Sequence, residues 1–235
     1  MIIDDYKKIM ADVLDVTTHV RQVKGNSGVG EKNFVMCFLI YYFKCKTTLD
    51  LGVYGGGSLF PQATMHNKYT DGIVYGVDPY NKEDMVQFDN TDTEFLKLQK
   101  DVLNNLDVEE LYHYILNLIN ELSYADNVKF LRMRSDKAIN YFVENNVRFD
   151  LMFIDGNHDT KNAMSDMVLY IPRLNNNGFL VIDDTPWPSI RPAYDYAKTQ
   201  LSFVYERHGD GGFAVLQKTD VENIELKEII NKIIK

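Results

Sequence analysis

The stretch TTLDLGVYGGGS (residues 47–58) decides the fold of this chain. Its first part, residues 47–53, is a short apolar run that predicts a buried strand, and this run leads directly into glycines. Glycines at a strand-to-helix turn let the backbone approach a ligand closely and present amide N–H groups to it. The stretch therefore predicts the first unit of a parallel sheet; a purely structural tight turn is the alternative.

Further apolar runs bounded by turn residues follow along the chain. Four of them cover residues 72–78, 128–133, 150–155 and 178–183. Helix-like stretches separate these runs, which is the layout of a parallel sheet with crossover helices. The runs 201–206 and 212–217 flank a His-Gly-Asp-Gly turn and predict an antiparallel hairpin at the edge of the sheet. The sequence thus predicts an α/β fold.

Two segments lie outside this pattern. Residues 4–23 have helical apolar spacing and residues 32–43 form a second helix candidate, so we expect an N-terminal helical segment, 1–46, that covers the substrate region of a domain spanning 47–235. The long segment 79–127 holds two helix candidates between residues 93 and 122. One crossover helix needs fewer residues, so this insertion is either a lid or substrate-binding element, or a helical hairpin without function.

Charge and composition limit the classes of partner that the protein can have. The net charge is −9 and no cluster of Lys and Arg is visible, which argues weakly against nucleic acid and anionic membranes. Apolar runs are too short to span a membrane and the N-terminus lacks the layout of a signal peptide, so a cytoplasmic location is expected. Cys37 and Cys45 are expected to be reduced and buried. The sequence does not predict the oligomeric state, and a homo-oligomer is one of the possibilities.

Acids follow the first two predicted strands. Asp50 precedes Gly52, where a carboxylate would repel a dinucleotide pyrophosphate but suits a cationic ligand such as S-adenosylmethionine (SAM). The GxGxxG spacing of dinucleotide sites is absent, because Gly52 and Gly56 stand four positions apart. Asp78 ends the second strand, where a carboxylate can accept hydrogen bonds from both ribose hydroxyls of an adenosine cofactor. Capping of the next turn is the alternative for Asp78.

A polar group follows the third strand. Ser135 and Asp136 come after Arg134 at the carboxyl end of this strand, where an adenine ring would lie. Ser135 is equally well placed to be the N-cap of the following helix. The sequence does not choose between a cofactor contact and a helix cap.

The strongest pattern is FDLMFIDGNHDT (149–160) followed by GFLVIDDT (178–185). Both are apolar strands that end in acids, and consecutive strands bring Asp155, Asp183 and Asp184 together. Three carboxylates would raise one another's pKa unless a cation offsets their repulsion, and oxygen ligands suit magnesium, calcium or manganese. Adjacent strand residues point to opposite faces, so the last two acids share an ion only if the chain turns there. The alternative is that the acids cap turns or position a cofactor.

His158 stands three residues past Asp155 in a predicted loop. It is a candidate general base for a substrate hydroxyl, with a cofactor contact or a structural hydrogen bond as alternatives. Asp159 and Lys161 are other candidate bases.

The stretch GNSGVGEK (25–32) resembles a phosphate-binding P-loop. However, Glu31 stands where the P-loop lysine belongs, and no Ser or Thr follows Lys32. The P-loop interpretation therefore fails, and the hinge of a lid is the alternative for this stretch.

Taken in order, the blocks DLGVYGGGS, YGVDPY, FDLMFIDGNHDT and GFLVIDDT resemble class I SAM-dependent methyltransferases. They are most similar to the metal-dependent small-molecule O-methyltransferases, a group that includes cephalosporin hydroxylase-like proteins and macrolide sugar O-methyltransferases. The match runs from about residue 47 to 186, and the insertion matches nothing assignable. The resemblance implies a Rossmann-like, doubly wound sheet of seven strands whose last strand is antiparallel.

The resemblance also implies roles for individual residues. The cofactor site would comprise Asp50, Gly52, Tyr54, Gly56 and Ser58 at the methionine end, Asp78 at the ribose, Ser135 and Asp136 at the adenine, and Asp155. A magnesium-type site would comprise Asp155, Asp183 and Asp184, with His158 and Asp155 as catalytic residues. Relatives often carry Glu where Asp50 and Asp183 stand, and the shorter Asp puts the reach of both contacts in doubt.

The function expected is SAM-dependent methylation of a hydroxyl on a small molecule, a sugar or natural product, assisted by a divalent metal. A metal-independent methyltransferase with His158 as the base is the first alternative. A nucleotide-dependent oxidoreductase and a non-catalytic binding protein on the same scaffold are the others.

Overall fold

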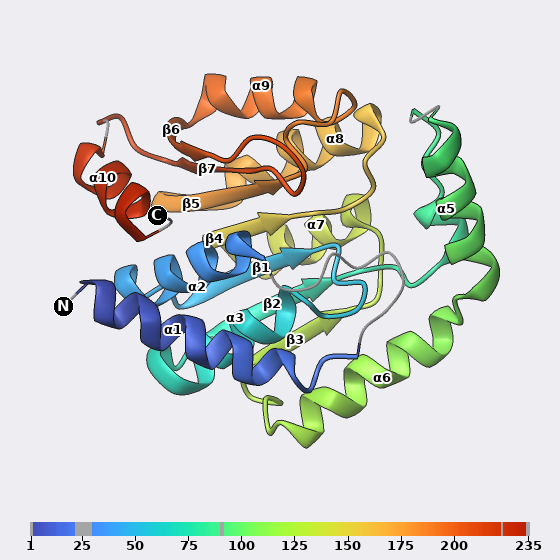
Figure 1. The fold of residues 1–235 in the computed structure, drawn as a ribbon, viewed down its shortest axis with the longest axis horizontal. Helices are drawn as coiled ribbons and strands as arrows, with labels where there is room; N and C mark the ends of the chain where they lie inside the picture. Colours follow the sequence, from blue (N-terminus) through green and yellow to red (C-terminus); the bar gives the residue numbers. More distant parts are fainter. Residues whose placement is uncertain (1, 22–29, 90–91, 222, 234–235) are drawn as a thin grey trace.

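The computed structural model describes residues 2–21, 30–89, 92–221 and 223–233 of the 235-residue chain. Within them, one seven-stranded sheet has the order β3-β2-β1-β4-β5-β7-β6 (Figure 1). The strands are β1 (Thr47–Leu51), β2 (Ile73–Val77), β3 (Val128–Leu131), β4 (Phe149–Ile154), β5 (Leu174–Asp183), β6 (Ser202–Glu206) and β7 (Phe213–Gln217). β1 to β5 pair in parallel, and β7 runs antiparallel to both β5 and β6. The predicted doubly wound sheet with an antiparallel last strand is confirmed.

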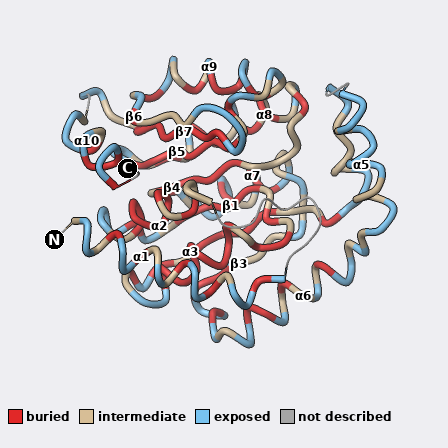
Figure 2. Tube along the Cα trace, viewed as in Figure 1, coloured by how far each residue is buried: buried red, intermediate tan, exposed pale blue. Residues whose placement is uncertain are grey.

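Helices cover both faces of the sheet. They are α1 (Ile2–Thr17), α2 (Glu31–Phe43), α3 (Leu59–Met65), α4 (Lys82–Met85), α5 (Thr93–Asn105), α6 (Val108–Glu121), α7 (Ser135–Glu144), α8 (Thr160–Tyr170), α9 (Arg191–Gln200) and α10 (Ile224–Ile233), with a π-helical turn η1 (His66–Thr70) and a 3-10 turn η2 (Ile171–Arg173). The helices α7, α8 and α9 share one core cluster with the sheet, and α1, α2 and α10 share another. Figure 2 shows the buried positions gathered in the strands between these layers.

Alternation along the strands explains the two layers. In β4, Met152 and Ile154 pack with α7 to α9, whereas Leu151 and Phe153 pack with α1, α2 and α10. This follows from the period of two in a strand, which sends neighbouring side chains to opposite faces. Because both faces are covered, the strand is apolar from Leu151 to Ile154, as expected for a parallel sheet.

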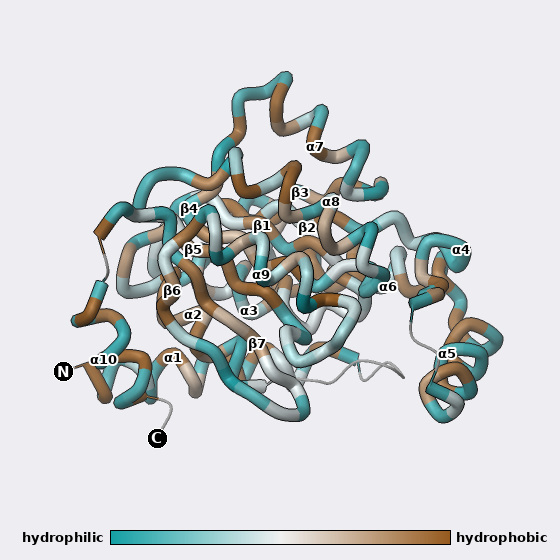
Figure 3. The backbone as a smooth tube through the Cα atoms, turned by 90° about the horizontal axis from the view of Figure 1, so that it is seen from above, coloured by the Kyte–Doolittle hydropathy of each residue, from teal (hydrophilic) through white to brown (hydrophobic). Residues whose placement is uncertain are grey.

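The insertion forms the two helices expected between residues 93 and 122, namely α5 and α6. Leu111, Ile115 and Leu118 on α6 are buried in a cluster that includes residues of α3. In contrast, α5 buries none of its residues and stands clear of the sheet in Figures 1 and 3. The arrowheads of β1 and β4 in Figure 1 point toward the side on which α5 lies. The insertion therefore lies beyond the carboxyl ends of the strands.

The N-terminal segment contains both expected helices, but α1 ends at Thr17 rather than near residue 23. The hydroxyls of Thr17 and Thr18 donate to the carbonyls of Leu14 and Asp15, which competes with continued helical bonding at this end. Residues 25–29 of the glycine-rich stretch lie outside the described residues, which resume at Gly30. The proposed boundary at residue 46 falls directly before β1 and stays a prediction.

Two expectations about composition can be compared with the structure. Cys37 and Cys45 are free and buried, as predicted. In the described part of the chain, no helix combines the length and apolar character that a membrane crossing needs.

Candidate active site

Asp50, near the carboxyl end of β1, is a fully buried carboxylate with one open oxygen. Its Oδ1 accepts a hydrogen bond from the Ser58 hydroxyl at 3.0 Å. Its Oδ2 is buried without a hydrogen-bond partner among the described residues. Burial raises the pKa of Asp50 well above its usual range, and the charges of Asp155 and Asp78 add to this rise, whereas the Ser58 hydrogen bond and the charge of Lys32 oppose it only in part. A cationic group placed against Oδ2 would hold the carboxylate ionised.

The turn after β1 depends on glycine. Gly52 has φ +95°, and a Cβ there would lie 2.0 Å from the carbonyl oxygen of Asp155. Gly56 has φ +82°, and a Cβ there would lie 2.5 Å from the ring of Phe60. A side chain at either position would collide with its neighbour, and both φ values favour glycine. Gly52 thus brings the turn after β1 into contact with the loop after β4, and Gly56 lets the same turn pack against α3.

Asp78, directly after β2, lies beside this turn. Its Oδ2 accepts from the amide of Tyr54 at 2.9 Å, and its Oδ1 accepts from the amide of Tyr80 at 2.8 Å. Burial raises the pKa of Asp78, and these amides oppose the rise. The bond from Tyr80 is the turn-capping contact that the sequence left open. The amide of Val53 also lies in hydrogen-bond range of this carboxylate, and these bonds leave part of its acceptor capacity open for a ribose hydroxyl.

Ser135 and Asp136 begin α7. Arg134 takes the N-cap position, so Ser135 is not the cap, and no side-chain bond caps the helix. Asp136 Oδ1 pairs with Arg134 Nε at 3.0 Å, and Arg134 also pairs with Asp84 in the insertion. The adenine role of Ser135 and Asp136 stays a prediction.

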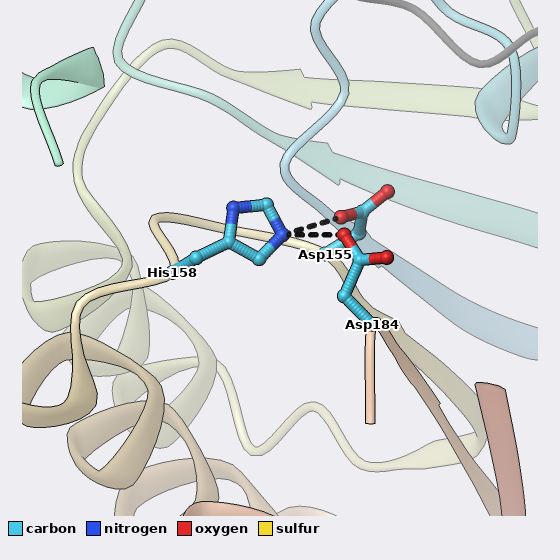
Figure 4. A group of neighbouring side chains, drawn as sticks. All are labelled: Asp155, His158 and Asp184. Carbon is cyan, nitrogen blue, oxygen red and sulfur yellow. Dashed lines mark ion pairs between the residues drawn. The ribbon is translucent and has the colours of Figure 1, made fainter. Parts of the chain in front are cut away.

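The chain turns between Asp183 and Asp184, as the metal hypothesis requires. β5 ends at Asp183, and Asp184 has φ 52°, in the left-handed region. This turn points Asp184 toward the loop after β4, where His158 Nε2 lies 3.0 Å from Asp184 Oδ2 and 3.4 Å from Asp155 Oδ1 (Figure 4). One ligand atom from each of these three side chains lies within 4.8 Å of the others. They form a group that can hold a metal ion.

Asp183 has a different neighbour, which the sequence interpretation missed. Lys32, in the first turn of α2, forms an ion pair with Asp183, and its Nζ lies 3.6 Å from Asp155 Oδ2. The other oxygen of Asp183, Oδ1, is buried without a hydrogen-bond partner in the described part of the chain. The three expected metal ligands therefore have different neighbours: Asp184 faces His158, Asp183 faces Lys32, and Asp155 faces both.

A family model described as a methyltransferase domain matches residues 49–185, which is more than half of the chain. The chain belongs to the methyltransferase domain family. The expected class I SAM-dependent methyltransferase is thereby confirmed, and the oxidoreductase alternative loses its support. No curated protein matches the sequence.

Solved structures share the fold of this methyltransferase. The O-methyltransferase from Bacillus cereus in complex with S-adenosylhomocysteine (SAH) is 14% identical over 90% of each chain, with a TM-score of 0.56. The O-methyltransferase TomG from Streptomyces achromogenes, involved in tomaymycin synthesis and bound to SAM, is 12% identical over 88% of this chain and 89% of its own, with a TM-score of 0.57. The SAH-bound Podospora anserina methyltransferase PaMTH1 is 15% identical over 90% of this chain and 88% of its own, with a TM-score of 0.54. At such identities the likeness shows the fold alone.

The charges at the acidic group of this methyltransferase are strongly coupled. Burial lowers the pKa of His158, but hydrogen bonds and charge from Asp155 and Asp184 outweigh burial and raise it to about 10. Burial also works against the charge of Lys32, yet Asp155 and Asp183 raise its pKa. A histidine must be neutral before it takes a proton. His158 can become neutral near pH 7 only if another positive charge lies between Asp155 and Asp184.

The other candidate bases of this methyltransferase are less suited to proton transfer. Asp159 is buried, and its Oδ1 already accepts from the amides of Phe88 and Asp89 at 2.7 and 2.8 Å. Lys161 is exposed on α8. His158 is the candidate base that shares a group with the converging acids.

The sequence interpretation missed an aromatic contact of His158. The ring of Trp187 lies 4.9 Å from the imidazole with an interplanar angle of 35°. Phe95 of α5 contacts Trp187 edge to face at 5.6 Å. The sequence around Trp187 does not predict its contact with His158, because this contact depends on how the loops after β4 and β5 meet.

Proposed function

We propose that this methyltransferase transfers the methyl group of SAM to a hydroxyl oxygen of a small molecule, a sugar or natural product, assisted by a divalent cation. The carrying observation is that an open, buried carboxylate and a group of acids with a histidine meet at one turn. Asp50 supplies the former, Asp155 and His158 belong to the latter, and the Gly52 backbone lies directly against Asp155. A cationic methyl donor and an oxygen acceptor can meet there.

The cofactor half rests on complementary charge and hydrogen bonding. Asp50 Oδ2 would face the ammonium of the methionine part, since it is buried and open. Asp78 would accept from the ribose hydroxyls through its remaining lone pairs. Tyr54, Gly56 and Ser58 would line the same turn, with Ser135 and Asp136 at the adenine end. Bound SAM supplies the activated methyl group.

The acceptor half contains the residues that suit a divalent ion. Asp155 and Asp184 would hold it, and Asp183 would complete an oxygen set for magnesium, manganese or calcium once Lys32 moves away. Such an ion lowers the pKa of a coordinated hydroxyl and orients it. His158 would then take the hydroxyl proton at Nε2, because this is the nitrogen that faces Asp155 and Asp184.

A second candidate is metal-independent methylation, and Lys32 is the observation that favours it. Its ammonium already contacts Asp183 and lies 3.6 Å from Asp155. A permanent internal cation would offset part of the repulsion among the acids. His158 would then act as the base without a metal.

The N-terminal segment, 1–46, would close one side of this site. Besides Lys32, the Asn33 amide nitrogen donates to the carbonyl of Gly57 in the cofactor turn at 3.0 Å. The first turn of α2 thus contacts both halves of the site. We propose on this basis that residues 1–46 cover the substrate region of the domain 47–235. A cytoplasmic location is proposed separately and does not rest on these contacts.

Calorimetry and a transfer assay test the proposal. SAM and SAH should bind to the purified protein and NAD should not. Methyl transfer from labelled SAM is then measured with catechols, sugars and polyketide alcohols, first in EDTA and then after addition of Mg²⁺ or Mn²⁺. Transfer that is lost in EDTA and restored by metal supports the first candidate, and full transfer in EDTA supports the second. SAM binding without transfer to any acceptor would contradict both.

A further inference from the structure

The start of the insertion is bonded to the loop that carries His158. Each residue from 157 to 160 in this loop has a hydrogen-bond partner between residues 84 and 89. The bonds are Asn157 Nδ2 to the carbonyls of Asp84 (3.0 Å) and Val86 (2.8 Å), Gln87 Nε2 with His158 Nδ1 (2.8 Å), the amides of Phe88 and Asp89 to Asp159 Oδ1 (2.7 and 2.8 Å), and the amide of Thr160 to Asp89 Oδ2 (2.7 Å). The insertion therefore supports the candidate catalytic loop directly.

Gln87 is the member of this set that touches the imidazole. Its backbone is held by α5, because the amide of Gln87 donates to Gln99 Oε1 at 2.7 Å and Gln99 Nε2 donates to the Gln87 carbonyl at 3.3 Å. Its side chain meets His158 at Nδ1, while the ring also stacks near Trp187. The imidazole is thus fixed at its edge by the insertion and on its face by the loop after β5.

The free end of the Gln87 side chain indicates a role for the amide. Its Oε1 is buried and has no hydrogen-bond partner within the described ranges. A half turn of the amide would exchange Nε2 for Oε1 at the ring, since both ends of the group are alike in shape. In one orientation the amide donates to a bare Nδ1, and in the other it accepts from a protonated Nδ1.

Only one of these orientations suits proton transfer at Nε2. Nε2 faces Asp155 and Asp184, where an acceptor hydroxyl would lie. A neutral imidazole carries one N–H, so Nε2 can take a proton only while Nδ1 holds the hydrogen. Gln87 Oε1 accepts from that Nδ1–H before the transfer and keeps accepting from it in the imidazolium afterwards. An amide stabilises this form without adding a further negative charge to the acids.

We infer that Gln87 is a positioning residue that selects the reactive tautomer of His158, and that the insertion is present on this fold to carry it. The inference rests on the proposed role of His158 as the base. It assigns the segment 79–127 to the working site, and it separates α5, which supports Gln87, from α6, which packs in the core.

The imidazole N–H signals of ¹⁵N-histidine-labelled protein saturated with SAH provide the test. Mg²⁺ is added with the SAH, because a cation between Asp155 and Asp184 is needed for a neutral ring whose tautomer the signals report. In this sample we expect His158 Nδ1 of the wild type to be protonated, Nε2 to be unprotonated, and the Nδ1–H to exchange slowly with water. Gln87→Met keeps the length of the side chain but neither donates nor accepts, so this signal should be lost. Gln87→Glu can accept and should restore it. His66, held by Thr48 and Thr70, should give unchanged signals in every sample and serves as the internal reference.

Activity and binding complete the test. Methyl transfer should fall by about 10- to 100-fold in Gln87→Met and recover substantially in Gln87→Glu, while SAH affinity stays within about twofold of the wild type in both. Lys97→Gln, an exposed change on α5, is the matched control and should alter nothing. Gln99→Met, which removes the support of Gln87, should weaken the same N–H signal and serves if Gln87→Met does not fold.

The outcomes separate this inference from the proposed function. An unprotonated Nδ1 in the wild type, or an unchanged N–H signal in Gln87→Met, would overturn the inference even if methyl transfer is found. If Gln87→Met loses the Nδ1–H signal but the wild type methylates no acceptor, the contact between Gln87 and His158 is supported. The role of His158 as the base is then contradicted.

Discussion

The carboxylates at the two ends of the parallel strands differ in whether the protein satisfies their hydrogen-bonding capacity. At the amino ends, Asp150 accepts from the amides of Lys46 and Thr47 at 2.8 and 3.1 Å and from Asn175 Nδ2 at 2.8 Å. At the carboxyl ends, Asp50 and Asp183 each keep one buried oxygen without a hydrogen-bond partner in the structure described. Buried polar groups are normally satisfied because leaving them unpaired is costly. The carboxylate at the amino ends is satisfied within the protein, whereas two carboxylates at the carboxyl ends keep oxygens that a bound ligand could satisfy.

The same contrast holds for the two buried histidines. His66, near the amino ends, is enclosed by the hydroxyls of Thr48 and Thr70 at 2.9 and 2.7 Å, and burial lowers its pKa to about 4. His158, at the carboxyl ends, lies against two carboxylates, which raise its pKa to about 10. A histidine held neutral serves packing, and one held charged by acids is available for chemistry once those acids bind another cation.

Asp155→Asn should give the largest effect at the carboxyl ends. Asp155 faces both Lys32 and His158, so its charge affects the cation and the candidate base together. We expect methyl transfer to fall by about 10²- to 10⁴-fold and divalent-metal affinity to fall with it, while the fold stays intact. Initial rates, metal titration and circular dichroism are the measurements, with Asp184→Asn as a second variant. Unchanged metal titrations in both variants would remove the metal site.

His66 should make the stability of the protein depend on pH, and the following values describe its contribution alone. Its pKa is about 4 in the folded protein and 6.5 as the reference value, so the unfolded chain binds more protons between these values. Stability should therefore be complete above pH 6.5 and fall as the pH drops toward 4, by about 2–3 kcal/mol between pH 7 and pH 4.5 at 1.36 kcal/mol per unit. Urea unfolding at both pH values measures this.

His66→Gln is the control for that experiment. The variant lacks the titrating group and should lose less stability than the wild type over the same pH range. Parallel pH curves for the two proteins would show that His66 is not held neutral, and the amino ends would then not be complete within the protein.

Asp50→Asn and Asp150→Ala compare the two ends directly. Asp50→Asn should weaken SAM binding by about 10-fold or more, because a charge-assisted hydrogen bond contributes about 1.5–3 kcal/mol. It should not destabilise the free protein, since burial raises the pKa of Asp50 and thereby disfavours its ionised form in the folded state at neutral pH. Asp150→Ala leaves three donors without their acceptor and should cost about 1–3 kcal/mol with SAM affinity unchanged.

Calorimetry with SAM and denaturant unfolding of both variants measure this pair. The comparison fails if Asp50→Asn destabilises the protein as much as Asp150→Ala does, because Asp50 would then be a structural carboxylate like Asp150. It also fails if both variants lose SAM affinity equally.

Residues that stand at strand ends could be predicted from the sequence. Asp50, Asp78 and Asp155 follow apolar runs, and parallel strands bring their carboxyl ends to one side of the sheet. The turn that directs Asp184 could be stated only as a condition, because it depends on a φ of 52° that no residue type at this position dictates. The fold and the set of converging acids could therefore be predicted from the sequence. Which of these acids lie together in the structure could not.

Contacts made by residues outside the sheet could not be predicted from the sequence. Lys32 meets Asp183 across 151 positions and Gln87 meets His158 across 71 positions. Neither contact follows from local spacing, because it depends on how α2 and the insertion lie over the strand ends. Both residues stand in segments that the sequence marked only as helical or unassigned, so their types carried no signal by themselves.

Lys32→Met gives the smallest expected effect and tests whether the carboxyl ends are indeed reserved for ligands. The ammonium of Lys32 occupies Asp183 and lies 3.6 Å from Asp155, so it competes with an ion for the same carboxylates. Removing it while keeping an apolar stem should raise Mn²⁺ affinity by about fivefold, which corresponds to about 1 kcal/mol. Titration followed by electron paramagnetic resonance measures this, with Lys161→Met as an exposed control. If Mn²⁺ affinity falls instead, Lys32 organises the acids rather than competing with the ion, and the protein itself completes part of this end of the sheet.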